Sequence, residues 1–399
     1  MFGVRRQKTP APVGAKPVAE SAGAVAPSAN LPIRAETRQD RSRTAYFSKG
    51  QFLARQDRWD MLGRLIAETD RTRATTPSGE ALAAVLAVGA RDDAVRHARS
   101  AIQSTDCPVP MGVEALTEIA EEHPESWAIH LVAARAQMDC AWAYEGQIDP
   151  YALPFAPSDA FMARFDVASE LIARAEELCP TSAEVAAAKC DLLAAVPEAG
   201  DLVDALHRDV IAADPTNPGR LRNYGVHLLP RWFGSYSDLS QTSADLGAEM
   251  AADWGESAYA WMWFDALRLD PEAGAVLDAE YFVAGLHSIL DRTSDAHLAN
   301  LIAAYVDGMK PAAAPDDLSP DAMKARRLIH AALPDLTERH LTELHPQVWA
   351  RADALPGATH AGPLSSGRIA AATAQAKSAV DAAVAARALA ADQGIARRA

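Results

Sequence analysis

The best candidates for metal ligands in this sequence are His340, Glu343 and His345, because imidazole and carboxylate groups are common donors to divalent metal ions. In a helix, His340 and Glu343 share one face, since side chains three residues apart are neighbours. His345 falls nearly opposite them and precedes Pro346. This spacing favours solvent-facing residues at a helix end, so the sequence predicts no metal site and no bound cofactor.

Sequence motifs of the common catalytic sites are absent. The chain contains no G-x-G-x-x-G, no G-x-x-x-x-G-K-[ST], no H-E-x-x-H and no G-x-S-x-G, so none of the sites that these motifs mark is indicated. We therefore predict that the chain is not an enzyme. The alternative is a hydrolase or transferase with a site that no motif marks, in which His227 and Arg231 meet acidic residues in a pocket.

Aromatic residues are concentrated between residues 254 and 264, a short distance after an Arg-Trp pair. Within this segment, Trp261 and Trp263 are two residues apart and must lie on different helix faces. The residues that dominate binding energy at interfaces are often Trp, Tyr and Arg. The candidate partner-binding residues are Arg231, Trp232, Tyr236, Tyr259, Trp261 and Trp263. The alternative is that most of these side chains fill the core between helices.

Charge is divided unevenly along the 399 residues, whose net charge is −15. Residues 114–321 hold 11 basic and 36 acidic side chains. Residues 1–43 hold 8 basic and 3 acidic side chains, and residues 366–399 hold 5 basic and 2 acidic ones. The acidic body disfavours nucleic acid as a partner, because phosphate binding requires Lys and Arg. It would attract a basic peptide. The two basic ends are either ordinary linkers or internal ligands that fold onto the acidic body.

Cysteine usage and hydropathy predict a cytoplasmic protein. The four cysteines, Cys107, Cys140, Cys179 and Cys190, form no C-x-x-C pair and lie in or beside helical patterns, so we expect reduced, buried thiols. No stretch approaches the roughly 18 apolar residues of a membrane-spanning helix, and no apolar signal-peptide region follows the first six residues.

The elements that must position these residues are short helices that repeatedly end at a proline followed by a small polar residue. The tetrapeptides at 123–126, 179–182 and 214–217 each end one apolar-periodic stretch and begin the next. Pro180 and Pro215 lie 35 residues apart, close to the 34-residue unit of helix–turn–helix repeats. The sequence therefore predicts an all-α fold, a degenerate tetratricopeptide-like α-solenoid whose neighbouring units stack to bury their apolar faces.

Four regions are expected. A disordered basic arm occupies 1–43, N-terminal helices 44–112, the helical-repeat body 113–355, and an alanine-rich tail with little to bury 356–399. The first helix begins near Tyr46, with Phe52, Trp59, Leu62 and Ile66 on one face. The other expected helices are 80–88, 92–103, 114–122, 127–144, 159–178, 183–195, 201–213, 220–229, 237–252, 256–269, 275–290, 295–309, 320–333 and 336–344.

The segment Leu228-Leu229-Pro230-Arg231-Trp232-Phe233-Gly234-Ser235 resembles the turn motif of a family of uncharacterised, tetratricopeptide-like bacterial proteins. In that family a helix ends in a Pro/Lys-Arg/Lys-Trp-Gly-Gly-Ser turn, and Phe233 here stands where the family has its first glycine. The Trp-Ala-Tyr-Glu-Gly sequence at 142–146 and the Ala-x-x-Leu-x-Pro pattern at 175–180 are also similar to that family. The resemblance covers about residues 46–290 and implies the repeat fold, without an activity.

The turn itself has a physical interpretation. Pro230 has no backbone donor and should end the helix before it, and Gly234 permits a tight reversal. Ser235 or Ser237 can cap the next helix, while Trp232 should cover the joint between the two helices. Together with the charge pattern, these features predict a protein-interaction scaffold or adaptor that binds a partner segment in an acidic, aromatic-lined groove. Neither nucleic-acid binding by the body nor membrane insertion is expected.

Overall fold

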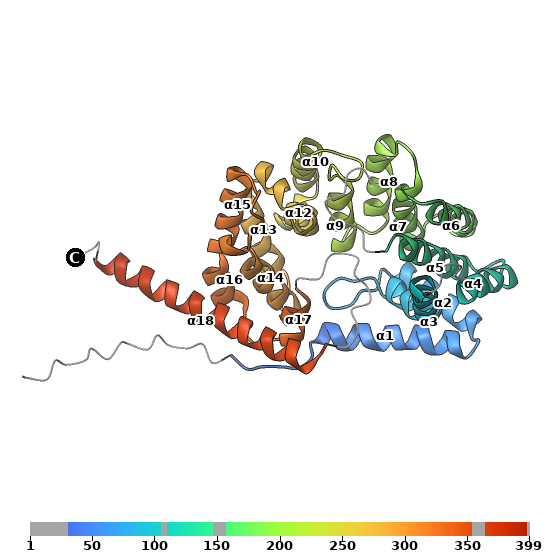
Figure 1. Ribbon diagram of the computed structural model, residues 1–399, viewed down its shortest axis with the longest axis horizontal. Helices are drawn as coiled ribbons and strands as arrows, with labels where there is room; N and C mark the ends of the chain where they lie inside the picture. Colours follow the sequence, from blue (N-terminus) through green and yellow to red (C-terminus); the bar gives the residue numbers. More distant parts are fainter. Residues whose placement is uncertain (1–30, 105–109, 147–156, 353–363, 397–399) are drawn as a thin grey trace, which may run out of the picture.

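The computed structural model describes residues 31–104, 110–146, 157–352 and 364–396 (Figure 1). Within these ranges the chain forms α-helices and short 3-10 helices, with two isolated β-bridges and no strand, which confirms the predicted all-α class. The α-helices are α1 (Arg38–Arg55), α2 (Trp59–Arg71), α3 (Leu82–Ser104), α4 (Met111–Glu122), α5 (Trp127–Glu145), α6 (Asp159–Leu178), α7 (Ala183–Leu192), α8 (Gly200–Ala213), α9 (Pro218–His227), α10 (Tyr236–Glu249), α11 (Ala251–Trp254), α12 (Ser257–Leu269), α13 (Ala279–Asp291), α14 (Ala296–Gly308), α15 (Pro320–Ala331), α16 (Leu333–His340), α17 (Pro346–Arg351) and α18 (Ser366–Ala396). The 3-10 helices are η1 (Leu193–Ala195), η2 (Pro271–Val276) and η3 (Pro311–Ala313).

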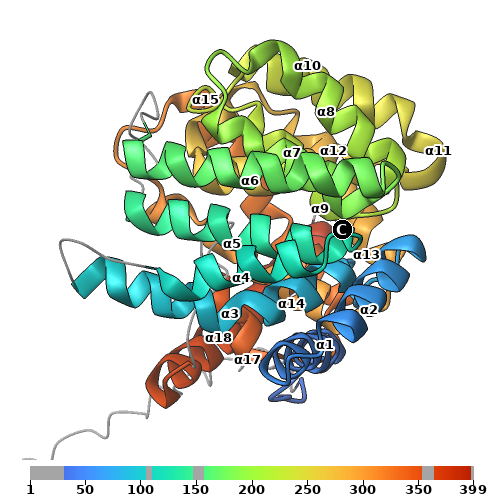
Figure 2. The ribbon, with the colours of Figure 1, turned by 90° about the vertical axis from the view of Figure 1, so that its right-hand side faces the viewer.

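The helices form a curved row that bends back on itself (Figure 1). Helices α1–α6 lie on one side, α7–α12 follow across the top, and α13–α18 descend on the other side. Figure 2 shows α6, α5 and α3 as successive layers on the first side. The row closes where Ile33 and Leu344 form a parallel β-bridge: Arg34 N donates to Leu344 O at 2.8 Å, and Leu344 N donates to Pro32 O at 2.9 Å.

The loop between α2 and α3 projects into the middle of this closed row (Figure 1). We call residues 72–81 the central loop. Ser78 N donates to Gln39 Oε1 of α1 at 3.0 Å, and Ser78 Oγ donates to Asp295 Oδ2, just before α14. Arg73 donates from Nε to Ala213 O at 2.8 Å, at the end of α8. The loop therefore joins three parts of the row that are far apart in sequence.

The N-terminal arm ends earlier than the sequence predicted. Helix α1 begins at Arg38, because Thr37 and Asp40 form a reciprocal capping box: each side chain accepts from the other residue's backbone N–H at 2.9 Å. Residues 38–43, expected in the disordered arm, are thus helical. Residues 1–30 of that arm lie outside the described residues. On α1 itself, Phe52 is 56% exposed, whereas its neighbour Leu53 is buried.

One long helix, α3, replaces the two short helices expected at 80–88 and 92–103. Gly89, where we expected a break, lies against the backbone of α1: a Cβ at this position would be 2.1 Å from Phe47 O. The glycine therefore allows two helices to approach closely and does not interrupt α3.

The alanine-rich tail also differs from the expectation. Helix α18 packs against α16 and α17, and it buries Ala372, Ala376, Ala379, Val380 and Ala383. These positions follow the three- and four-residue spacing of one helix face. A face of small side chains thus buries itself by close approach to neighbouring helices, which composition alone did not indicate.

One apolar stripe of α6 forms part of the core of the middle helices. Phe161 and Phe165 are buried with their rings stacked at 4.3 Å between centroids, and Ala168, Ile172 and Ala175 continue the stripe. Of the cysteines, Cys140 and Cys190 are buried free thiols and Cys179 is half-buried, while Cys107 lies outside the described residues. Among the described residues, no helix combines the length and apolar character needed to cross a bilayer.

Candidate functional site

The concave side of the row encloses a cavity of about 460 Å³, which we call the central cavity. Its lining comes from α1, the central loop, α3, α5, α7, α8, α9 and α14, so that residues as far apart in sequence as Gln39 and Leu301 line the same cavity. The polar side chains that line it are Gln39, Ser78, Glu80, Arg135, Glu184, Asp191, His207, Asn217, Arg220, Arg222, Asn223 and His297. The cavity is thus lined by charged groups of both signs and by amides.

A buried ion cluster forms one wall. Arg220 of α9 contacts Glu184 Oε1 of α7 at 2.5 Å and Asp214 Oδ2 at 3.2 Å. The three side chains are 12%, 5% and 4% exposed. Asp70 of α2 lies beside them and accepts from Glu184 N at 3.1 Å; burial, followed by the charge of Glu184, raises the pKa of this carboxyl. Through these contacts the cluster links α2, α7 and α9 beside the cavity.

Two further arginines are paired with carboxylates. Arg135 of α5 binds Asp191 of α7, and Asn223 Nδ2 of α9 donates to Asp191 Oδ1 at 3.2 Å. Arg222 donates to both oxygens of Asp265 at 2.8 Å, a bidentate pair. Its guanidinium also lies 5.6 Å from the ring of Trp261. These pairs hold the polar lining in fixed orientations.

Two buried histidines are in contact here, and one of them, His207, belongs to the lining of the cavity. His207 Nε2 and His227 Nδ1 are 3.0 Å apart, and the His207 ring stacks on Tyr224 at 4.5 Å. Burial lowers the pKa of His227 to about 4 and that of His207 well below its ordinary value. Burial raises the pKa of the nearby Cys190 thiol to about 12, so this thiol is a weak nucleophile.

The histidine pair predicts that stability falls in acid. Because the folded protein keeps His227 neutral, the unfolded chain binds more protons between about pH 6.5 and 4, and stability decreases as pH falls through this range. The loss from His227 alone should approach about 3 kcal/mol near pH 4. Urea unfolding at a series of pH values measures it.

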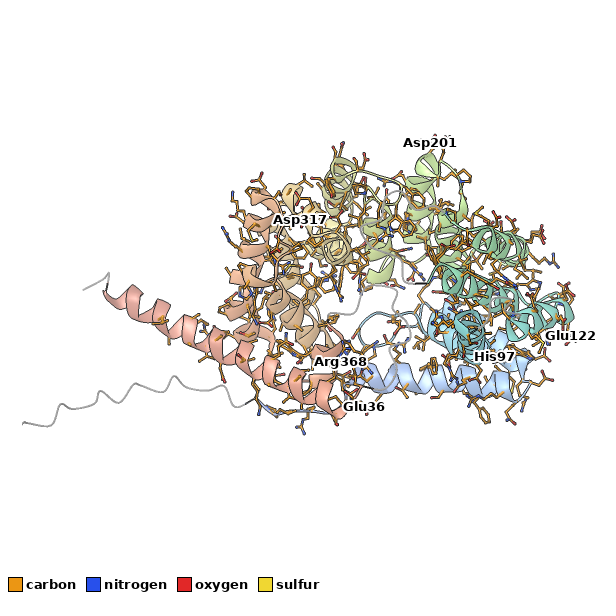
Figure 3. All side chains as sticks on the ribbon, in the orientation of Figure 1. Glu36, His97, Glu122, Asp201, Asp317 and Arg368 are labelled. Atoms are coloured by element: carbon orange, nitrogen blue, oxygen red, sulfur yellow. The ribbon has the colours of Figure 1, made fainter. Side chains whose placement is uncertain are left out.

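The matched control is the exposed His97, on the outer side of the row (Figure 3). His97→Gln should keep the wild-type dependence of stability on pH, whereas His227→Gln should flatten it. An unchanged dependence in His227→Gln would show that the pair does not titrate in this way.

Three of the six candidate partner-binding residues lie in the core. Tyr259, Trp261 and Trp263 of α12 are 3%, 3% and 0% exposed. Trp263 Nε1 donates to Ser243 Oγ at 2.8 Å, which satisfies its polar atom inside the protein. These three side chains fill the core between helices, as the alternative stated. In this conformation they expose almost no surface to a partner.

The other three candidates cover a joint between helices. The guanidinium of Arg231, itself only 7% exposed, lies 5.0 Å from the ring of Trp232, which contacts Trp142 of α5 edge-on at 6.1 Å. Tyr236 donates from its hydroxyl to Asp270 Oδ2 at 2.9 Å. Ser235 caps α10 by accepting from Asp238 N at 3.2 Å, as the turn motif predicted.

The central cavity is not the aromatic-lined groove that the sequence predicted. None of the six candidates is among the described residues that line the central cavity, and that lining contains no Trp, Tyr or Phe. Acidic residues such as Glu122 and Asp201 instead lie on the outer rim (Figure 3). Sequence analysis missed Arg135, Glu184 and Asn223, because only the packing of distant helices shows that these polar residues face inwards.

The three candidate metal ligands, which we expected to face solvent at a helix end, do not all do so. His345 is 2% exposed, because residues 341–345 pack against the N-terminal segment that closes the row. Its Nε2 lies 2.9 Å from Glu343 Oε1, whereas His340 Nε2 lies 3.1 Å from His287 Nδ1. Within the described ranges, no three His, Cys, Asp or Glu side chains are grouped as a metal would require.

Comparison of the chain with protein-family models, with curated proteins and with solved structures finds no match.

Proposed function

We propose that the chain is a binding protein, a tetratricopeptide-like solenoid closed on itself, whose central cavity receives a short segment of a partner protein. The observation that supports this proposal most directly is the largely polar lining of one cavity, to which eight separate parts of the chain contribute residues. The volume of about 460 Å³ lies within the range of known ligand sites and admits a few residues of an extended segment.

The chemistry of the lining suits a peptide. An extended segment presents backbone N–H and C=O groups along its length, and these need donors and acceptors at fixed positions. Asn223 supplies both kinds of group, and the arginine–carboxylate pairs supply both charges. The acidic outer surface would attract a partner whose flanking residues are basic, so binding should weaken as salt increases.

The test uses Asn223, which lines the cavity and donates from its amide nitrogen to Asp191. Asn223→Ala should weaken binding of the partner segment by roughly tenfold, the cost of about one hydrogen bond to a desolvated group. Partners are first identified by cross-linking and co-purification with the full chain. Affinity is then measured by fluorescence anisotropy with a peptide from the cross-linked region.

The matched control is Gln241→Ala on the exposed face of α10, which also removes an amide. This variant should bind like the wild type, and circular dichroism should show both variants folded. Equal affinities for the two variants would exclude the cavity as the binding site, even if a partner is found.

The hydrolase or transferase alternative has less support from the geometry. His227 Nδ1 meets His207 and not a carboxylate, and both rings have lowered pKa values that make them weak bases at neutral pH. Cys190 has a raised pKa. A binding role in a reducing compartment such as the cytoplasm, where these free thiols would persist, is therefore the function that we propose.

A further inference from the structure

The apolar core of the row is divided into two large clusters. Among the described residues, one cluster joins helices of α1–α7, which we call the first body, and the other joins elements from η1 to α18, which we call the second body. A small cluster of Ala187, Cys190 and Val210 lies between them, where α7 contacts α8. Because each body has its own packed core, the two can move relative to each other without unfolding.

The two bodies are joined firmly on one side of the central cavity. There the chain itself continues from α7 to α8, and the buried ion pair of Arg220 with Glu184 crosses the boundary. Asn223 of the second body also donates to Asp191 of the first body at 3.2 Å. Since this side combines covalent connection with buried charge pairing, it is the expected pivot of any movement.

Polar contacts close the opposite side of the cavity, where the start of α1 lies beside α17 (Figure 1). Thr37 Oγ1 of the first body lies 3.2 Å from His297 Nδ1 of the second body. Ser78 Oγ of the central loop donates to Asp295, just before α14. Water can replace each of these side-chain hydrogen bonds when the two bodies separate, so this side opens more easily than the pivot.

The segment before α1 extends from the first body to the second. We call residues 31–36 the strap. Its backbone pairs with Leu344 through the two hydrogen bonds that close the row, in which Arg34 N donates to Leu344 O and Leu344 N donates to Pro32 O. Leu31 packs against the apolar cluster of the second body. The strap is therefore bound to the second body in the manner of an added β-strand.

The strap is accessible to water along most of its length. Residues 32–36 are all exposed. The ion pair of Arg34 with Glu343, at 3.4 Å, joins side chains that are 63% and 28% exposed, so it contributes little to the attachment. A segment that is bound mainly through exposed backbone pairing is released far more readily than a helix with a buried apolar face.

The second body presents a fixed surface to the strap. Asn300 of α14, which is 0% exposed, donates from Nδ2 to Glu343 O at 2.9 Å and accepts from His345 N at 2.9 Å. Its Oδ1 also accepts from Trp349 Nε1 at 3.0 Å. Asn300 thus holds the backbone on both sides of Leu344. Because these bonds lie within the second body, the surface remains in place when the strap leaves and can bind the strap again.

The contacts that close the row adjoin the lining of the central cavity. The first body and its loop contribute Gln39, Ser78 and Glu80 to this lining, and α14 contributes His297, Leu298 and Leu301. Movement of α14 away from α1 therefore separates two parts of the lining and widens the cavity between them.

We propose that the strap is a latch that controls entry to the central cavity. When its backbone leaves Leu344, the second body rotates away from α1 about the junction of α7 with α8, and a partner segment enters through the opening. Renewed pairing with Leu344 then closes the row around the bound segment. This inference rests on the function proposed above, because it assigns the regulation of binding at the same cavity.

Hydrogen–deuterium exchange of the full wild-type chain measures release of the strap without a ligand. The amide of Leu344 donates to Pro32 O, so its exchange requires that the strap leave. We expect this amide to exchange roughly 100-fold faster than the amides of α12, whose exposure requires unfolding of the second body. If the Leu344 amide is protected as strongly as those of α12, the strap does not open and the inference is overturned.

Two substitutions at one position show that the backbone bond is responsible. Arg34→Pro removes the N–H that donates to Leu344 O and should accelerate exchange of the Leu344 amide by about tenfold. Arg34→Ala keeps this N–H and removes only the exposed ion pair, so it should change the rate by less than about threefold. Equal rates in the two variants would contradict the pairing of the strap with Leu344.

A disulfide across the strap tests its role in binding. Ile33 and Leu344 pair in a β-bridge, and bridged residues lie about 5 Å apart, so the double variant Ile33→Cys/Leu344→Cys can form this bond. The probe is the fluorescent peptide of the Asn223 test, mixed with the full chain in a stopped-flow instrument. The oxidised double variant should bind it roughly tenfold more slowly than the same protein after reduction. Wild type treated with the oxidant should bind as untreated wild type does.

The results separate the strap from the binding site. Equally fast association of the oxidised and reduced forms overturns the role of the strap and leaves the cavity as the binding site. Absence of peptide binding by the wild type and by the reduced form contradicts the proposed function, and the role of the strap with it. If the disulfide does not form, Arg34→Pro decides: it should speed association by about threefold or more relative to Arg34→Ala, and equal rates overturn the inference.

Discussion

Arg220→Ala is expected to lower the free energy of unfolding by about 3–5 kcal/mol, because it leaves two buried carboxylates without their shared cation. Glu184 and Asp214 are 5% and 4% exposed and both contact Arg220. Asp70, 6% exposed and hydrogen-bonded to Glu184 N, adds a third buried carboxyl to the same region. Removing the guanidinium therefore concentrates uncompensated negative charge where water cannot screen it.

Two variants make this prediction specific. Arg208→Ala breaks contacts to Asp204 at 3.0 Å and Glu249 at 2.9 Å, but Arg208 is 43% exposed, so the loss should stay within about 1 kcal/mol. Arg220→Lys keeps the charge but not the planar fork and should fall between wild type and alanine. Urea unfolding of the three variants measures the order of these stability losses. If Arg220→Ala lowers the free energy of unfolding no more than Arg208→Ala does, the buried cluster contributes no more to stability than a surface ion pair.

The helix boundaries show what local sequence could predict. Helix α6 spans Asp159–Leu178 as expected, because Ser158 caps its start and the proline at 180 follows its end. Helix α9 starts two residues earlier than expected, since Asn217 caps it and Pro218 occupies its first turn. Capping and proline are local signals, so the sequence displays them directly.

The central cavity could not be predicted in this way. Arg135, Glu184 and Arg220 have the composition of an ordinary solvated helix face, and each becomes an inward-facing residue only through contacts with helices tens of residues away. The closure of the row depends on Ile33 and Leu344, which are 311 positions apart. Conversely, the aromatic cluster looked like a binding surface because its residue types match interface anchors. Its side chains are buried because α12 is covered by α9, α10 and α13.

The close approach of α9 and α12 leads to the second prediction, that Gly225→Ala lowers the free energy of unfolding by about 3 kcal/mol or more. A Cβ at Gly225 would lie 1.8 Å from Met262 O, whereas ordinary contact begins at 3.4 Å. The neighbouring atom belongs to the backbone of α12 and cannot rotate away. The two helices must therefore separate, and the packing of Tyr224 and Trp263 beside the contact must loosen with them.

Gly308→Ala is the matched control, since Gly308 also lies in a helix but is exposed and has no atom within 4 Å of its added Cβ. It should raise stability by up to about 1 kcal/mol, because alanine restricts the unfolded chain more than glycine does. The contrast separates steric conflict from helix propensity. Similar unfolding midpoints for the two variants would contradict the close contact of α9 with α12.

The same substitution should also affect binding at the central cavity. Helix α9 carries Arg220, Arg222 and Asn223, and its distance from α12 determines how Arg222 meets Asp265 and how far Asn223 reaches into the cavity. A folded Gly225→Ala variant should therefore bind the partner peptide more weakly than Gly308→Ala does, although neither glycine provides a side chain to the ligand. If Gly225→Ala lowers stability but leaves peptide affinity unchanged, the ligand does not contact the α9 wall, and the binding site lies elsewhere on the row.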